Sequence, residues 1–134
     1  MPGFSINYNE NFGDRMVILY DSLTGNVARF VKKLPLETRK ITEGLVMEEA
    51  FVLITFTTGL GKVPDTTASF LEVNHKHLKG VASSGNKNFG VYYAVAADEI
   101  CETYHVPIVS KFELSGTQAD VNLFMERLIE IETH

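Results

Sequence analysis

The sequence is poor in the residues that cross-link small proteins. Its 134 residues include one cysteine, Cys101, and no tryptophan. A lone cysteine forms no intramolecular disulfide and cannot complete a four-ligand zinc site, so the fold must rest on its hydrophobic core. A chain without a disulfide framework is typical of a reducing compartment, and we expect a cytoplasmic location.

The sequence also lacks an excess of positive charge and any long apolar run. It has 12 Lys plus Arg against 17 Asp plus Glu, for a formal net charge of -5. Nucleic acid is not an expected partner, because neutralising phosphates takes a basic face. No span approaches the roughly 18 apolar residues of a membrane helix, and the first 15 residues are too polar for a signal peptide. We therefore expect a soluble protein with no membrane partner.

The length and the 45% of hydrophobic residues are typical of one domain with a sizeable core. Residues 1–15 are rich in turn formers and show no apolar period, which predicts a flexible N-terminal extension. Residues 16–134 are expected to form the single domain.

Apolar runs and turn residues alternate along that domain. The continuous runs at 16–20 and 50–56 predict strands buried on both faces, and 38–41, 78–83 and 107–112 predict shorter strands, the first of them at an edge. Helices are expected at 27–34, from Pro64 through an apolar face that includes Phe70, Leu71 and Val73, at 92–104 and at 121–131. The connection 42–49 is too short for a clear helix. This order predicts an α/β fold with a parallel sheet covered by helices on both faces.

Three loops rich in Gly, Ser, Thr and Asn follow predicted strands, at 21–26, 57–64 and 84–90. Ligands of open parallel sheets bind outside the carboxyl ends of the strands, so these loops are expected to meet at one ligand site.

The first loop offers Ser22, Thr24, Gly25 and Asn26 just before a helix N-terminus, an arrangement that favours a phosphate group. Simple capping of the helix explains these residues equally well. The sequence lacks both the nucleotide-triphosphate motif G-x-x-x-x-G-K-[ST] and the three-glycine dinucleotide motif, so a mononucleotide is the better candidate.

The second loop combines Gly59 and Gly61 with Thr57 and Thr58, and glycine lets a backbone approach a flat ligand closely. An ordinary strand-to-helix turn is the alternative.

In the third loop, Asn86 and Asn88 could hydrogen-bond the edge of a ring on which Phe89 stacks. A buried Phe89 that only seats the loop is the alternative.

Other reactive side chains show no pattern of a catalytic or metal site. His75 and His77 would point about 200° apart on a helix and cannot share a metal. Cys101 lies in a predicted helix without a cationic cluster, which favours inert packing. We therefore expect no side-chain catalytic site.

Four segments together resemble a known family: Asp-Ser-Leu-Thr-Gly-Asn-Val at 21–27, Thr-Thr-Gly-Leu-Gly-Lys-Val-Pro at 57–64, Ser-Gly-Asn-Lys-Asn-Phe-Gly at 84–90, and the stretch 106–116 with Lys-Phe-Glu-Leu-Ser-Gly. They are similar to the NrdI family, the flavodoxin-like activating proteins of class Ib ribonucleotide reductase, over about residues 16–131. The resemblance implies a flavodoxin-like three-layer sandwich with a five-stranded parallel sheet in the order 2-1-3-4-5.

The resemblance also implies non-covalently bound FMN, with the first loop on its phosphate and the other two around its isoalloxazine ring. Many members of the family resemble this loop but have Trp at the position of Phe89. The implied cofactor contacts are Ser22, Thr24, Gly25, Asn26, Val27, Thr57, Thr58, Gly59, Leu60, Gly61, Ser84, Gly85, Asn86, Asn88, Phe89 and Gly90.

By this resemblance the protein is a redox accessory protein rather than an enzyme. Once reduced, by a partner of unknown identity, it would react with O₂ and deliver superoxide or peroxide to the dimanganese small subunit, where a tyrosyl radical forms. Lys62 and Lys87 would place positive charge near the flavin and attract small anions, although solvated lysines without such a role are equally compatible with the sequence.

Two other functions are compatible with this type of fold, and they belong to different classes of protein. A general electron-transfer flavodoxin would share the fold and the cofactor, but the short chain and the basic loop residues count against it. A response-regulator receiver would share the strand order, but it needs a phosphorylatable Asp at the end of the third strand, where Phe56, Thr57 and Thr58 stand. Asp21 and Lys111 do not replace that residue.

Overall fold

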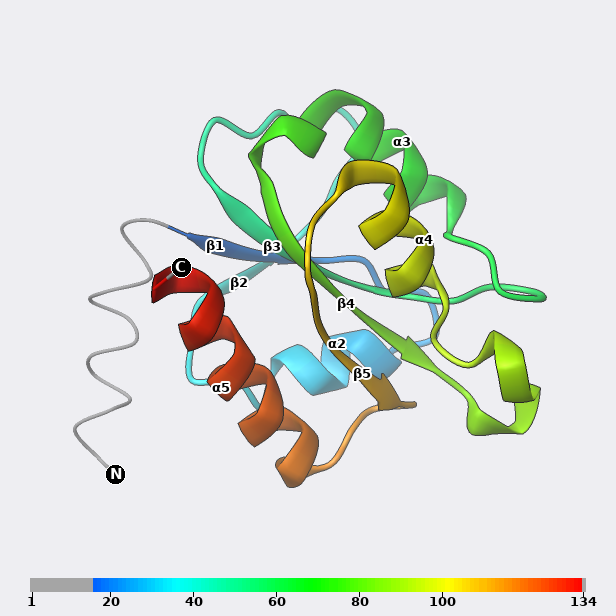
Figure 1. The fold of residues 1–134 in the computed structure, drawn as a ribbon. Helices are drawn as coiled ribbons and strands as arrows, with labels where there is room; N and C mark the ends of the chain where they lie inside the picture. Colours follow the sequence, from blue (N-terminus) through cyan, green and yellow to red (C-terminus); the bar gives the residue numbers. More distant parts are fainter. Residues whose placement is uncertain (1–15, 134) are drawn as a thin grey trace.

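A computed structural model describes residues 16–133 (Figure 1). The predicted extension at residues 1–15 lies outside the described residues. The strands are all parallel and form one sheet in the order β2-β1-β3-β4-β5, which confirms the predicted topology. Their bounds are β1 Val17–Tyr20, β2 Thr38–Lys40, β3 Phe51–Phe56, β4 Leu78–Gly85 and β5 Ile108–Glu113.

Helices cover both faces of this sheet (Figure 1). The α-helices are α2 Asn26–Val31, α3 Asp65–Asn74, α4 Ala96–Tyr104 and α5 Gln118–Thr133, and two 3₁₀ helices are η1 His75–His77 and η2 Lys87–Tyr92. One apolar cluster joins α2 and α5 to the sheet, and a second joins α3 and α4 to the opposite face. These are the three expected layers.

The central strand β3 shows why continuous apolar runs predicted buried strands. Phe51 to Thr55 are all buried, because helices pack on both faces of the sheet. On the α2 and α5 side, Phe30 stacks on Phe112 with ring centroids 3.9 Å apart, and Phe124 meets Phe30 edge to face.

The sequence prediction was wrong at three places. β4 continues through Ser84 and Gly85, which pair with β5, so these residues belong to a strand rather than to the following loop. Helix α4 begins at Ala96 instead of 92, because the chain runs through η2 and then through Ala94 at a positive φ of 51°. Val73 is 61% exposed, since the buried face of α3 follows the spacing Thr67, Phe70, Leu71 and Asn74.

The other connections agree with the sequence. Residues 41–50 join β2 to β3 without a helix, and β2 lies at the sheet edge, as its polar composition indicated. Among the described helices, none is long and apolar enough to cross a membrane.

Candidate functional site

The carboxyl ends of β1, β3, β4 and β5 surround a cavity of about 280 Å³, hereafter the carboxyl-end cavity. Residues of all three predicted loops line it, together with residues of α2, β3 and η2 and one residue after β5. The lining residues are Ser22, Leu23, Thr24, Asn26, Val27, Phe56, Thr57, Thr58, Gly59, Ser84, Gly85, Asn86, Phe89, Tyr92 and Leu114.

Most residues of the predicted cofactor set line this cavity. Gly25, Leu60, Gly61, Asn88 and Gly90 belong to the same loops but do not line it. The lining residues that the sequence analysis missed are Leu23, Phe56, Tyr92 and Leu114. Leu114 could have been found, because it directly follows the strand at 108–113 and therefore lies at the same sheet edge.

The first loop is both a helix cap and a source of free donors. The Ala28 N–H donates to Ser22 Oγ at 3.2 Å, so Ser22 caps α2 as the alternative interpretation held. Gly25 turns the chain at a φ of 97°. Among the described residues, no acceptor meets the backbone N–H of Asn26 or Val27. These two amides at the start of α2 can still serve an anion.

Side chains also tie the first loop to the loop after β5. The amide of Asn26 and the guanidinium of Arg29 both hydrogen-bond Ser115 Oγ. No local pattern in the sequence connects Arg29 with Ser115, because 86 residues separate them.

The second loop is a tight turn that depends on glycine. Thr58 and Lys62 exchange two backbone hydrogen bonds of 2.9 and 2.8 Å around Gly59 at a φ of 51° and Gly61 at a φ of 84°. A Cβ at Gly61 would lie 2.7 Å from Val95 Cγ2, whereas one at Gly59 would meet nothing within 4 Å. The space beside the Gly59 Cα is therefore open.

The third loop carries two aromatic side chains on the cavity wall. Asn86 Oδ1 accepts the N–H of Asn88 at 2.9 Å and so caps η2. Phe89 is 52% exposed and Tyr92 is 43% exposed, and both line the cavity. Phe89 is thus not the buried loop anchor of the alternative interpretation, and its ring is available for stacking.

Two serine hydroxyls of β4 hydrogen-bond backbone carbonyls of the segments beside the cavity. Ser83 Oγ donates to Ala94 O at 2.7 Å, and Ser84 Oγ donates to Leu114 O at 2.6 Å. Ser84 lines the cavity, but its hydroxyl is committed to this internal bond. A Cβ at Gly85 would lie 2.8 Å from Ala94 Cα, so only glycine allows the two segments to approach.

The buried carboxylate of Asp21 anchors the start of the first loop. Asp21 Oδ2 accepts the hydroxyls of Thr66 and Thr67, the latter at 2.7 Å. Thr67 also shares a 2.7 Å hydrogen bond with Thr55 on β3. Asp21 therefore joins the end of β1 to the first turn of α3, and its function here is structural.

The two lysines of the ring loops lie outside the cavity. Lys62 and Lys87 are exposed and do not line it, and Lys87 Nζ lies 5.8 Å from the centre of the Tyr93 ring. Burial raises the pKa of the Tyr93 hydroxyl, and the charges of Asp120 and Glu113 raise it further. The phenol beneath Lys87 is therefore neutral at physiological pH.

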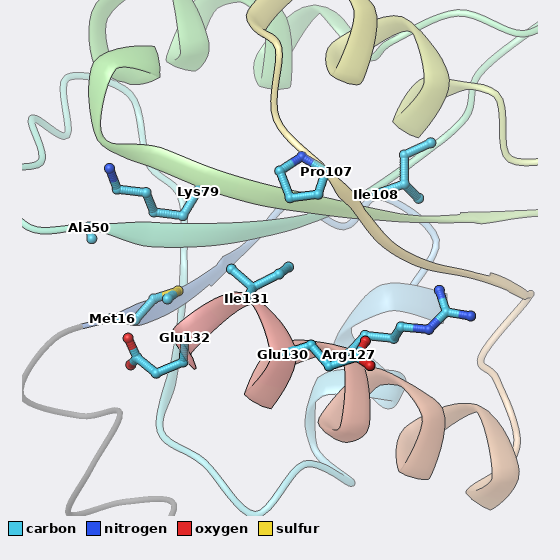
Figure 2. A pocket seen from close by; sticks show the side chains of 9 residues that line it. All are labelled: Met16, Ala50, Lys79, Pro107, Ile108, Arg127, Glu130, Ile131 and Glu132. Carbon is cyan, nitrogen blue, oxygen red and sulfur yellow. The ribbon is translucent and has the colours of Figure 1, made fainter. Parts of the chain in front are cut away.

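A larger cavity, of about 850 Å³, opens at the amino ends of the strands and is called the amino-end cavity here. Figure 2 shows its wall, built by α5, by the start of β4 and by the residues that lead into β5. It is lined by Met16, Ala50, Lys79, Pro107, Ile108, Arg127, Glu130, Ile131 and Glu132. Within residues 16–133, no group of three or more His, Cys, Asp or Glu could hold a metal ion.

A family model described as "NrdI Flavodoxin like" matches residues 18–126. The chain belongs to the NrdI flavodoxin-like family. It is 50% identical over 117 residues to "Protein NrdI" of Bacillus licheniformis, an alignment that covers 87% of this chain and 89% of that protein. The NrdI resemblance drawn from the four sequence segments is thereby confirmed.

Solved flavodoxins share the fold at low sequence identity. A short-chain flavodoxin associated with a PDU bacterial microcompartment is similar with a TM-score of 0.62 and 18% identity, covering 88% of this chain and 99% of that one. A mutant flavodoxin of Fusobacterium nucleatum, solved with bound flavin mononucleotide, has a TM-score of 0.51 and 17% identity, covering 90% and 94%.

Proposed function

We propose that the carboxyl-end cavity binds FMN and that the reduced protein activates the dimanganese small subunit of class Ib ribonucleotide reductase. The observation that carries the proposal is that one cavity is lined by residues of the first loop with free donors, by Gly59 and by the aromatic residues Phe89 and Tyr92. Family membership and the FMN-bound flavodoxin of the same fold support the same ligand.

The free donors of the first loop suit the FMN phosphate. The free amides of Asn26 and Val27 lie at the start of α2, where the helix dipole adds a positive field. Thr24 and Asn26, from the same loop, also line the cavity.

The aromatic residues suit the isoalloxazine ring. Phe89 and Tyr92 are exposed on the wall, and the space that a Cβ on Gly59 would occupy is empty. A Gly59 carbonyl that can turn toward the ring would stabilise its protonated, reduced forms and so tune the flavin potential. Phe89 offers a smaller stacking surface than the Trp of many family members.

When bound, reduced FMN would supply the reduction of O₂. One electron gives superoxide, and two electrons with two protons give hydrogen peroxide. The electrons come from a reducing partner whose identity the proposal leaves open. The oxidant then passes to the dimanganese centre of the partner, where the tyrosyl radical forms. The protein is thus an accessory redox protein without a catalytic side chain, and we place it in the cytoplasm.

The surroundings of the cavity favour a protein partner. Leu23, Leu60, Phe89, Val91 and Leu114 are exposed apolar residues of the loops that frame the cavity. Large exposed apolar side chains gathered at one place mark interaction surfaces more often than ordinary solvent-facing surface.

The decisive experiment mixes the photochemically reduced, FMN-loaded protein with a Mn(II)-loaded class Ib small subunit in air. We expect tyrosyl radical, measured by electron paramagnetic resonance, in proportion to the reduced protein added. Oxidised protein and free reduced FMN are the matched controls. If the reduced protein yields no more radical than these controls, the activating role is lost.

The same experiment separates the alternative of a general electron-transfer flavodoxin, which the fold similarity to flavodoxins favours. Such a carrier would hold FMN and exchange electrons with a reductase without producing radical in the small subunit. A protein that could not be reconstituted with FMN would exclude both flavin functions.

A further inference from the structure

Three side chains close a hydrogen-bonded triangle beside the first loop. Arg29 donates through Nη2 to Asn26 Oδ1 and through Nε to Ser115 Oγ, both at 2.9 Å. Ser115 Oγ donates to Asn26 Oδ1 at 2.8 Å. The triangle thus joins the first turn of α2 to the loop between β5 and α5.

The triangle fixes the orientation of the Asn26 carboxamide. A guanidinium has only donors, so the oxygen of Asn26 must face Arg29. Its Nδ2 then points the other way, toward Thr24 Oγ1 at 3.4 Å. Because Thr24 Oγ1 can accept this bond, its own proton stays available to a ligand, and both side chains present donors to the phosphate end of the cavity.

The loop that carries Ser115 is held against α2 and the turn that follows it. Lys33 Nζ donates to the carbonyl oxygens of Ser115 and Gly116 at 3.2 and 2.8 Å. Gly116 has a φ of 71°, and a Cβ there would lie 2.6 Å from Phe30 Cδ1. The Ser115 hydroxyl is therefore held in place before any ligand arrives.

Arg29 also brings a positive charge against the first loop. Its Nη1 lies 2.7 Å from the position that a Cβ on Gly25 would occupy. The guanidinium therefore packs against the loop backbone instead of extending into solvent, although the side chain is exposed. A doubly charged phosphate monoester would be attracted by this charge, whereas a neutral hydroxyl would not.

We infer that Arg29 and Ser115 are positioning residues for the phosphate of the flavin, an inference that rests on the proposed FMN function. Both residues orient the side-chain carboxamide of Asn26 so that its Nδ2 donates to the phosphate, and Arg29 adds a positive charge. The site therefore prefers FMN, which carries the phosphate, to riboflavin. Neither residue belongs to the set of cofactor contacts that the sequence implied.

The test compares the affinities of Arg29→Gln and Ser115→Ala for FMN and for riboflavin, measured by quenching of flavin fluorescence. We expect the FMN dissociation constant to rise about tenfold, because the Asn26 carboxamide loses the fixed orientation in which it donates to the phosphate. The riboflavin dissociation constant should change by less than about twofold, because riboflavin lacks the phosphate.

Two further variants make the test specific. Ser115→Thr keeps the hydroxyl and should restore most of the FMN affinity. Lys32→Gln removes a cation from the C-cap of the same helix, where the exposed lysine side chain makes no hydrogen bond within the described part of the chain, and should leave both affinities unchanged. Thermal unfolding of each variant checks that it is folded.

The inference fails if the variants weaken FMN and riboflavin binding equally, if neither affinity changes, or if Lys32→Gln weakens FMN binding as much as Arg29→Gln does. In each case the wild-type protein still binds FMN and the proposed function stands. A wild-type protein that binds neither flavin would instead remove the proposed function and, with it, this inference.

Discussion

The two cavities at opposite ends of the sheet differ in size and in chemistry, and the smaller one is the candidate site. The amino-end cavity has about three times the volume of the carboxyl-end cavity. The charged residues on its wall, Lys79, Arg127 and Glu130, are long side chains exposed to solvent. The carboxyl-end cavity is built from glycines, short polar side chains and free backbone amides. Helices of a parallel α/β fold direct their N-termini, with their partial positive charge, to the carboxyl ends of the strands, so of these two cavities the carboxyl-end cavity is the one that favours an anion. Donor geometry rather than volume therefore identifies the site.

The largest effect is expected where the carboxyl-end cavity depends on a close approach of two segments. In Gly85→Ala the new Cβ meets the backbone of Ala94, which cannot move without displacing the start of α4. We expect the free energy of unfolding to fall by about 3 kcal/mol, measured by chemical denaturation, and FMN binding to be lost with it.

Gly44→Ala is the matched control for that substitution. Gly44 has a φ of 83° but no atom within 4 Å of a new Cβ, so only the backbone strain of about 1 kcal/mol applies. Equal destabilisation by the two substitutions would show that the contact with Ala94 is unimportant.

The second effect concerns the aromatic wall. Phe89→Ala should raise the dissociation constants of FMN and riboflavin alike, by about tenfold, because it removes stacking and leaves the phosphate end intact. Stability should change little, since the side chain is half exposed. Phe89→Trp should bind both flavins at least as tightly as wild type. A loss confined to FMN would contradict the assignment of this wall to the ring.

A smaller effect is expected from the charges near the aromatic end. Lys62→Gln and Lys87→Gln should each lower the flavin midpoint potential by less than about 40 mV, because an exposed charge contributes at most about 1 kcal/mol in water. Potentiometric titration at two salt concentrations measures this shift, which should shrink at high salt. A shift of the opposite sign would show that these lysines do not stabilise the reduced, negatively charged flavin.

The smallest effect should come from the amino-end cavity. Lys79→Gln removes a cation from its wall, far from the carboxyl ends of the strands, and should change FMN affinity by less than about twofold and stability by less than about 0.5 kcal/mol. A tenfold loss of FMN affinity in this variant would show that the amino-end cavity takes part in FMN binding.

The sequence predicted the parts of the fold that local patterns determine. The run from Phe51 to Phe56 is apolar because both faces of β3 are covered, and the polar loops follow strands because a parallel sheet gathers its strand ends at one edge. The positions of most cavity residues followed from these two facts and from the family resemblance.

What the sequence did not predict depends on tertiary contacts. The polar pair Ser84 and Gly85 extends β4 because β5 pairs with it, and no local signal marks that pairing. The late start of α4 follows from the positive φ of Ala94, where the chain passes closely by Gly85. Arg29 and Ser115 meet only in the folded chain, so periodicity and motifs gave no indication of their contact.

The most direct test of the account is a crystal structure of the protein with FMN. We predict one flavin in the carboxyl-end cavity, with its phosphate at the backbone N–H groups of Asn26 and Val27 and its ring beside Gly59 and Phe89. A flavin bound in the amino-end cavity, or a flavin in the carboxyl-end cavity with its phosphate turned toward Phe89, would contradict it.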